Sequence, residues 1–188
     1  ARKEFDATPN TVVIGMLARV VRWKGYDVFL EAANVLRESL TDVMFICVGS
    51  GNALLVAKYV EKANTLGLQD FVKWLGPRND IAKLLNGMDI VTSASTSGEG
   101  FSNVIAEAMA VGKAVVATDV GEVRAVVGKS GVLVRPSNPD DLVKAWLYLS
   151  KDKQLRDEIG TSAREKICSS YSVEKMVNET QEVLLNLE

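Results

Sequence analysis

A run of small polar residues near the middle of the chain holds two carboxylates at a spacing that suits a sugar ligand. The run covers residues 93–103 and includes Glu99 between two glycines, and Glu107 follows 8 positions later. Connections between strands and helices of α/β units usually span about 2 to 6 residues, so a loop of this length indicates function. Carboxylates accept hydrogen bonds from vicinal sugar hydroxyls. The spacing therefore favours a polyhydroxylated ligand.

The helix expected after this loop would position both carboxylates. Ser102 or Asn103 would cap its start, where free N–H groups and the positive end of the helix dipole form an anion site. Glu107 has no cation three or four positions away, so a local ion pair does not explain it, although simple solvent exposure still does. Glu99 has no apolar neighbour except Phe101 against which it could be buried.

Three cations gather in an earlier loop. Arg19, Arg22 and Lys24 fall within six residues of a chain whose net charge is −2. A solvated charge run is the usual explanation of such a cluster. Its place at the carboxyl end of a predicted strand favours an anion site instead, because the planar fork of Arg and the point charge of Lys suit a diphosphate. The residues alone leave both explanations open.

A glycine-rich turn at residues 49–51 also follows a predicted strand and precedes a predicted helix. Leu54 stands where a G-x-G-x-x-G fingerprint requires its third glycine, so a dehydrogenase is poorly supported. The chain contains no G-x-x-x-x-G-K-[ST] motif, which excludes a P-loop nucleotidase. The glycines fit either a tight turn with positive φ or the close approach of a ligand.

The order of the elements predicts that these loops meet. Short β-branched runs alternate with amphipathic stretches from Thr11 onward, which is typical of βαβ units. We predict a Rossmann-like, doubly wound parallel six-stranded sheet in the order 3-2-1-4-5-6, with additional carboxyl-terminal helices. The first and fourth strands are then neighbours, so loops 18–25 and 93–101 flank the ligand crevice. The expected strands cover residues 11–17, 43–48, 71–75, 89–92, 114–117 and 132–134.

Composition narrows the classes of partner. The 188 residues are 47% hydrophobic and 24% charged, which suits a globular protein. The small net charge gives no generic attraction to nucleic acid, which is not an expected partner. No apolar run approaches the ~18 residues of a membrane span and no signal peptide is evident, so we expect a cytoplasmic protein. The chain has no histidine and no Asp-x-Asp motif, and Cys47 lies far from Cys168, so no metal site is expected.

Several segments, in order, resemble the carboxyl-terminal domain of retaining glycosyltransferases with the GT-B fold, in particular family four (glycosyl transferases group 1). Residues 99–107 resemble that family's E-x7-E segment, and the pair Arg19 and Lys24 resembles its strand-loop segment with an Arg and, five positions later, a Lys. The resemblance runs from about Thr11 to the end and also includes Val48-Gly-Ser-Gly51, Leu75-Gly-Pro-Arg78 and Ala114-Val-Val-Ala-Thr-Asp-Val-Gly121. It implies one half of a GT-B architecture.

The resemblance also implies roles for individual residues. Arg19 and Lys24 would contact the diphosphate of a nucleotide-sugar donor and Glu99 the transferred sugar, and these three are the expected catalytic residues. The other donor-binding residues would be Glu107 at the ribose, Gly49, Ser50 and Arg78 around the base, and Gly100, Phe101, Ser102, Asn103 and Val104 around the diphosphate and sugar.

The expected domain organisation follows from the same resemblance. Residues 1–10 would be a leader from a preceding interdomain region, and 11–170 the nucleotide-sugar-binding domain. Residues 171–188 would form a terminal helix that either packs on an amino-terminal domain absent from this chain or folds back on its own sheet. Its apolar stripe comprises Val173, Met176, Val177, Thr180, Leu184 and Leu187.

The expected function is retaining transfer of a sugar from a nucleoside-diphosphate donor to an acceptor hydroxyl. The acceptor, a glycan, lipid or small molecule, would bind to the absent amino-terminal domain, without which this segment should be inactive. No cofactor is expected, and peripheral membrane association of the whole protein stays open. The alternatives are a phosphorylase or sugar-nucleotide epimerase of the same fold, or a nucleotide-binding module without catalysis.

Overall fold

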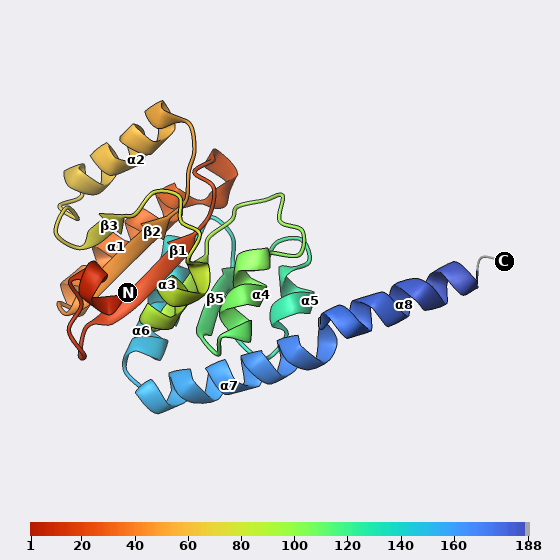
Figure 1. Ribbon diagram of the computed structural model, residues 1–188. Helices are drawn as coiled ribbons and strands as arrows, with labels where there is room; N and C mark the ends of the chain where they lie inside the picture. Colours follow the sequence, from red (N-terminus) through yellow and green to blue (C-terminus); the bar gives the residue numbers. More distant parts are fainter. Residues whose placement is uncertain (187–188) are drawn as a thin grey trace.

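Six parallel strands form one sheet in the order β3-β2-β1-β4-β5-β6. The computed structural model describes residues 1–186 (Figure 1), so Leu187 of the predicted terminal stripe lies outside the described residues. The strand order confirms the predicted doubly wound sheet. The strands are β1 (Val12–Leu17), β2 (Val43–Val48), β3 (Val72–Trp74), β4 (Ile90–Ser93), β5 (Ala114–Thr118) and β6 (Val132–Val134).

The central strands are continuous apolar runs because helices cover both faces of the sheet. Every residue of β1 and of β2 is buried, as expected of interior strands in a parallel sheet. Leu17 is paired with Val48, and Gly15 is paired with Val91 of β4. This register brings the carboxyl ends of β1, β2 and β4 to the same edge of the sheet.

The helices divide between the two faces, and the crossovers after β1 and β4 go to opposite sides, as predicted. One face carries α1 (Tyr26–Ser39), α2 (Ala53–Thr65) and α6 (Pro139–Ser150). The other carries the 3-10 helix η1 (Arg2–Phe5), α3 (Ile81–Gly87), α4 (Asn103–Ala110) and α5 (Val123–Val127). Helix α7 (Lys153–Ser170) contacts both sides, because its first half packs with the first group and its second half with the other. A second 3-10 helix, η2 (Arg22–Lys24), follows β1. The sequence pattern missed α5, because five residues are too few to show helical periodicity.

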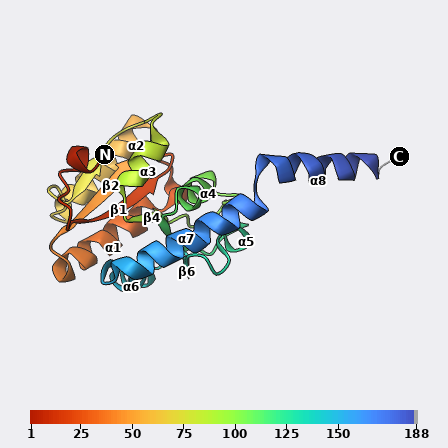
Figure 2. The ribbon, with the colours of Figure 1, turned by 60° about the horizontal axis from the view of Figure 1, so that its bottom comes forward.

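The last helix, α8 (Val173–Leu185), projects away from the domain (Figures 1 and 2). It contains no buried residue, and Met176 and Leu184 are both exposed. The alternative in which this helix folds back on its own sheet is therefore wrong. The physical reason is that α4, α5 and α7 already cover the nearest sheet face. Within residues 1–186, we find no helix whose length and apolar character would let it cross a membrane.

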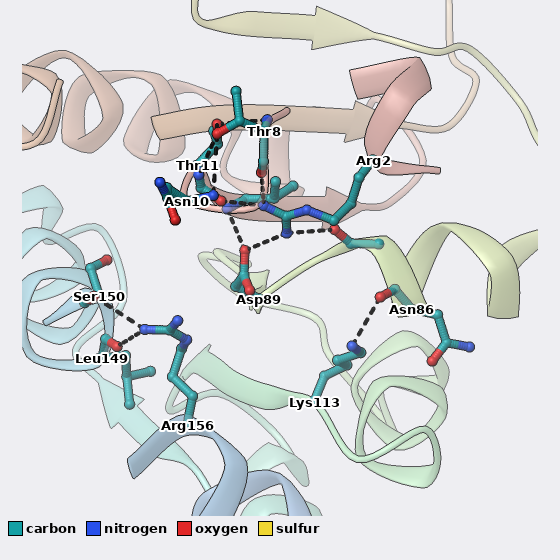
Figure 3. A network of polar contacts seen from close by, with 12 residues as sticks. Arg2, Thr8, Asn10, Thr11, Asn86, Asp89, Lys113, Leu149, Ser150 and Arg156 are labelled. Carbon is teal, nitrogen blue, oxygen red and sulfur yellow. Dashed lines mark hydrogen bonds and ion pairs between the residues drawn. The ribbon is translucent and has the colours of Figure 1, made fainter. Parts of the chain in front are cut away.

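The first ten residues, expected as a leader, pack against the domain. The Phe5 side chain is fully buried among the apolar residues of one sheet face. The Arg2 guanidinium donates to the Asp89 carboxylate at 2.9 Å and to the Thr8 carbonyl at 2.7 Å. Figure 3 shows these contacts. Asp89 also accepts the backbone N–H of Val13 at 2.8 Å, so the ion pair joins the amino-terminal segment to β1.

This packing predicts a large effect of Phe5→Ala on stability. Removing a fully buried phenyl group should lower the free energy of unfolding by about 3–5 kcal/mol, through lost burial and the cavity left behind. Chemical denaturation of the 188-residue chain measures the change. The matched control is Met176→Ala on exposed α8, which should stay within about 0.5 kcal/mol. A Phe5→Ala chain as stable as the control would contradict the packing of residues 1–10 on the domain.

Candidate functional site

Two adjoining pockets lie at the carboxyl edge of the sheet, with volumes of about 320 and 440 Å³. They share the Arg19 loop after β1 and the start of α4. All twelve residues predicted from the sequence line one pocket or both. Gly49, Ser50, Arg78 and Glu107 line the first, Lys24, Glu99, Gly100, Phe101 and Ser102 line the second, and Arg19, Asn103 and Val104 line both.

Backbone hydrogen bonds join the loops that surround the pockets. The N–H of Val20 donates to the Ser50 carbonyl at 2.8 Å, which ties the loop after β1 to the loop after β2. The N–H of Thr96 donates to the Trp23 carbonyl at 2.7 Å, which ties the loop after β4 to the same loop after β1. These bonds hold the cationic loop between its two neighbours, so its position depends on both.

Gly49 and Gly25 allow these loops to lie in direct contact. Gly49 has a φ of 146°, and a Cβ there would lie 1.9 Å from the Ala18 carbonyl oxygen. Gly25 has a φ of 78°, and its Cβ would lie 1.9 Å from the Ala94 carbonyl oxygen. Both positions need glycine for backbone conformation and for space. The glycine at position 49 is therefore explained by a turn packed on the neighbouring loop.

The Lys24 ammonium and the Glu99 carboxylate form an ion pair across the second pocket. Lys24 Nζ lies 2.8 Å from Glu99 Oε1 and 2.6 Å from Oε2. The Glu99 side chain is only 4% exposed and the Lys24 side chain 16%. Lys24 Nζ also lies 4.3 Å from the centre of the Trp23 ring, within the range of a cation–π contact. The pair places opposite charges at the pocket wall with little surrounding water.

The burial of Glu99 differs from what its neighbours in the sequence suggested. Apart from Phe101 the flanking residues offer no apolar cover, yet the loop folds so that the carboxylate is buried and paired with Lys24, whose ammonium lies over the Trp23 ring. The two predicted catalytic side chains are therefore brought together, and in this state they contact each other. A ligand that takes either of them must compete with this ion pair.

Arg19 and Glu107 provide the unpaired charges of the first pocket. Both residues are exposed, and neither forms an ion pair with any residue between 1 and 186. Arg78 differs, because its guanidinium donates to Asp80 at 2.7 and 2.8 Å and also to Glu4. These hydrogen bonds raise the pKa of Arg78 and lower the pKa of Asp80. Arg78 is therefore a fixed part of the wall, and Arg19 is the cation available to a ligand there.

The start of α4 supplies polar groups without partners. Ser102 occupies the N-cap position, as predicted, but its hydroxyl makes no capping hydrogen bond, so that part of the prediction is wrong. Its Oγ is buried and finds no partner in the described part of the chain. The backbone N–H groups of Asn103 and Val104 are likewise without an acceptor among residues 1–186. Free N–H groups at the positive end of a helix dipole favour an anion.

Four residues that line the second pocket were not predicted as site residues from the sequence: Leu17, Ala18, Trp23 and Gly98. Trp23 directly precedes Lys24 in the sequence, and an aromatic residue beside a loop cation is the signal that could have identified it. The pockets together combine three cations, Arg19, Lys24 and Arg78, and a helix start with two carboxylates. This set suits a ligand with both phosphate and hydroxyl groups. Among residues 1–186 no group of three or more Cys, Asp or Glu side chains is arranged to hold a metal ion.

Solved structures share this fold over nearly the whole chain. Anabaena Alr3699/HepE in complex with UDP-glucose is similar with a TM-score of 0.90 and 29% identity, covering 98% of this chain and 51% of that one. The carboxyl-terminal domain of the group 1 glycosyl transferase LpcC from Francisella tularensis is similar with a TM-score of 0.78 and 26% identity. It covers 86% of this chain and 87% of that one. The chain has the fold of one half of a GT-B glycosyltransferase, and it matches about half of Alr3699/HepE and most of the isolated LpcC domain.

Curated relatives agree with the structural neighbours. The chain is 33% identical to D-inositol 3-phosphate glycosyltransferase of Corynebacterium urealyticum, over 100% of its own length and 46% of the relative. It is 25% identical to trehalose synthase of Pyrococcus horikoshii, over 98% of its own length and 46% of the relative. The chain therefore spans about half the length of these relatives and corresponds to their carboxyl-terminal half. With the family profile matching residues 9–152, the chain belongs to the glycosyl transferases group 1.

Proposed function

We propose that this chain is the donor-binding half of a retaining glycosyltransferase that uses a nucleoside-diphosphate sugar. The observation that carries the proposal is the shared wall of the two pockets. Arg19 and the start of α4 lie between Glu107 on one side and the Lys24–Glu99 pair on the other. Crystal structures of the similar Anabaena Alr3699/HepE are complexes with UDP and with UDP-glucose, which supports a nucleotide sugar as the ligand.

In this proposal the nucleotide sugar extends from the first pocket into the second. The base lies against Gly49, Ser50 and Arg78, and the ribose hydroxyls donate to Glu107. The diphosphate lies between Arg19 and the free N–H groups at the start of α4. The sugar then enters the second pocket, where Lys24 turns to the diphosphate and the Glu99 carboxylate accepts hydrogen bonds from the sugar hydroxyls. Arg19 and Glu107 are free in this structure, so this part of the site needs no rearrangement.

Catalysis then depends on charge that grows on the leaving diphosphate. As the bond to the sugar breaks, Arg19, Lys24 and the α4 N–H groups stabilise the departing phosphate oxygens. A pre-placed donor of this kind contributes about 2.7–4 kcal/mol in a site that excludes water. The acceptor hydroxyl attacks the same face of the sugar that the diphosphate leaves and gives its proton to a departing phosphate oxygen, so the configuration is retained. Glu99 favours the positive charge that develops on the sugar ring. We propose no metal and no cofactor for this reaction.

The acceptor site belongs to the half of the transferase that this chain does not span. In this proposal, α8 and the apolar stripe along it pack on that other half. The stripe continues toward the domain through Tyr171, whose ring contacts Phe101 of the pocket loop with centroids 5.0 Å apart. Closure of the two halves would exclude water from the cleft, which the transfer requires.

Calorimetric titration of the 188-residue chain tests the proposed ligand. We expect weak binding of UDP and UDP-glucose, loss of both on Arg19→Ala, and no sugar transfer by the chain alone. The whole transferase should transfer the sugar to an acceptor. Binding without transfer by the whole protein would favour a nucleotide-binding module, and transfer to inorganic phosphate would favour a phosphorylase. No binding of any nucleotide would contradict the proposal.

Glu107→Gln should weaken donor binding more than it slows the reaction. A neutral amide loses the charge-assisted hydrogen bonds to the ribose, so the Kd for UDP should rise about tenfold while kcat falls less than about threefold. Calorimetry and steady-state kinetics of the whole transferase measure the two effects separately. Glu165→Gln, an exposed glutamate on α7 away from the pockets, is the matched control. A large loss of kcat with normal UDP affinity would rule out the ribose contact.

A further inference from the structure

The Glu99 backbone is held by contacts from outside its own loop. Between Ser97 and Phe101, no backbone N–H or carbonyl group forms a hydrogen bond with any other residue in the described part of the chain. The loop spans the distance from β4 to α4 without local secondary structure. Its path, and with it the position of the Glu99 carboxylate, must therefore be set by the elements packed against it.

Thr118, the last residue of β5, holds the start of this loop. Its side chain is fully buried, and its Oγ1 donates to the Ser95 carbonyl at 2.6 Å. The same oxygen lies 3.4 Å from the Ser93 carbonyl. A buried hydroxyl with this geometry fixes the direction in which the chain leaves β4. Ser95 is therefore anchored to the neighbouring strand, four residues before Glu99.

Gly121, in the turn after β5, lies directly against Glu99 itself. A Cβ at this position would fall 1.6 Å from the Glu99 carbonyl oxygen and 2.8 Å from its carbonyl carbon. Gly121 also has a φ of 56°, in the left-handed region that favours glycine. The obstacle is backbone, which cannot rotate away as a flexible side chain would. Only glycine lets the turn after β5 and the Glu99 backbone lie this close.

We infer that Thr118 and Gly121 are positioning residues for Glu99, and so for the catalytic half of the site. They fix the main chain at Ser95 and at Glu99, which directs the carboxylate to the Lys24 ammonium and the second pocket. Neither residue lines either pocket, so they act through Glu99 and do not touch the donor. The inference rests on the proposed role of Glu99 in sugar transfer. It adds a third loop, after β5, to the two that carry the charged groups.

Gly121→Ala tests this inference in the whole transferase. The added Cβ needs at least 3.0 Å from the Glu99 carbonyl oxygen, so the two backbones must separate by roughly 1.4 Å. A displacement of about 1 Å in a positioned group can cost about 100-fold in rate, and we expect kcat to fall by that factor. The affinity for UDP, which lacks the transferred sugar, should weaken less than about threefold because Arg19, Glu107 and the start of α4 are not displaced.

Gly112→Ala is the matched control for backbone strain. Gly112 also has a left-handed φ, of 71°, but its Cβ would meet only Gly160 at an ordinary 3.7 Å, and it lies outside both pockets. The kcat of the Gly112→Ala enzyme should stay near that of the parent enzyme. If Gly121→Ala keeps the parent kcat, or loses UDP affinity as strongly as kcat, the positioning role is wrong.

A double variant separates positioning of Glu99 from general damage. If Gly121 acts through Glu99, then adding Gly121→Ala to Glu99→Gln should lower kcat less than about threefold further. If the fall in kcat of the double variant equals the product of the falls in the two single variants, the inference is wrong. If Glu99→Gln itself leaves kcat unchanged, the proposed function of Glu99 fails instead, so the two failures are distinguishable.

Thr118→Val keeps the inference testable if the Gly121→Ala enzyme does not fold. Valine has nearly the shape of threonine but cannot donate to Ser95, so we expect kcat to fall about tenfold through displacement of the loop. Thr118→Ser retains the hydroxyl and should restore most of kcat. Full activity of Thr118→Val, or an equal loss in Thr118→Ser, would overturn the role of Thr118 and with it the inference.

Discussion

Lys24→Ala in the whole transferase should lower kcat/KM for sugar transfer by about 100-fold. In the described part of the chain, Lys24 and Arg19 are the two cations that line the second pocket. Without Lys24, the charge that develops on the leaving diphosphate loses one of its two cationic partners. Steady-state kinetics with a nucleotide-sugar donor measure the effect.

The same substitution should also destabilise the fold. Lys24→Ala leaves the Glu99 carboxylate, whose side chain is 4% exposed, without its partner. Removing one member of a buried pair is strongly unfavourable, and we expect a clear loss of thermal stability. The double variant Lys24→Ala with Glu99→Gln should regain most of that stability and none of the activity. This pattern separates the loss of the cation from damage to the fold.

Arg22→Ala is the matched control for Lys24→Ala. Arg22 is a cation of the same short helix η2, but it is exposed and lines neither pocket. Its removal should leave kcat/KM within about twofold of the parent, because an exposed charge contributes little through water. Equal effects of the two substitutions would mean that the charge of the loop matters and that the position of Lys24 does not.

Glu99→Gln should change catalysis and product binding in opposite directions. We expect kcat to fall about 100-fold, because the sugar loses the carboxylate that orients its hydroxyls and favours its developing charge. The affinity for UDP alone should rise about threefold to tenfold, equivalent to roughly 1 kcal/mol, because Lys24 no longer has to leave an ion pair to reach the diphosphate. Kinetics of the whole transferase and calorimetry with UDP give the two numbers.

A damaged site would lose both kcat and UDP affinity, so a fall in kcat with a rise in UDP affinity points to the specific contacts of Glu99. Glu38→Gln on α1 removes the same charge from an exposed position remote from the pockets, and it should change neither quantity. If Glu99→Gln weakens UDP binding, then the Lys24–Glu99 ion pair assists the diphosphate contact and does not compete with it. That result would contradict the state of the site described above.

The fold could be predicted because its signals are local. Buried parallel strands are short β-branched runs, and the helices between them carry apolar stripes, so their alternation predicted a doubly wound sheet. The observed order β3-β2-β1-β4-β5-β6 is the usual one for that fold. The same order placed the loops after β1 and β4 at one edge. For this reason every predicted site residue from Arg19 to Glu107 lines the two adjoining pockets.

The details that could not be predicted depend on contacts between distant residues. Lys24 and Glu99 are 75 positions apart, and their ion pair exists only because η2 and the loop after β4 are packed together. Phe5 belongs to a segment with no periodic pattern, yet it is fully buried. Ser102 was a reasonable cap by residue type, but its backbone does not have the extended conformation of an N-cap and its hydroxyl makes no capping hydrogen bond. None of these features has a signature in neighbouring residues.

A crystal structure of the chain with UDP-glucose tests most directly whether the two loops serve one ligand. We expect the diphosphate between Arg19 and the start of α4, the ribose on Glu107, and Lys24 moved from Glu99 to a phosphate oxygen. A nucleotide bound elsewhere, with the Lys24–Glu99 ion pair intact and Arg19 still free, would contradict this expectation.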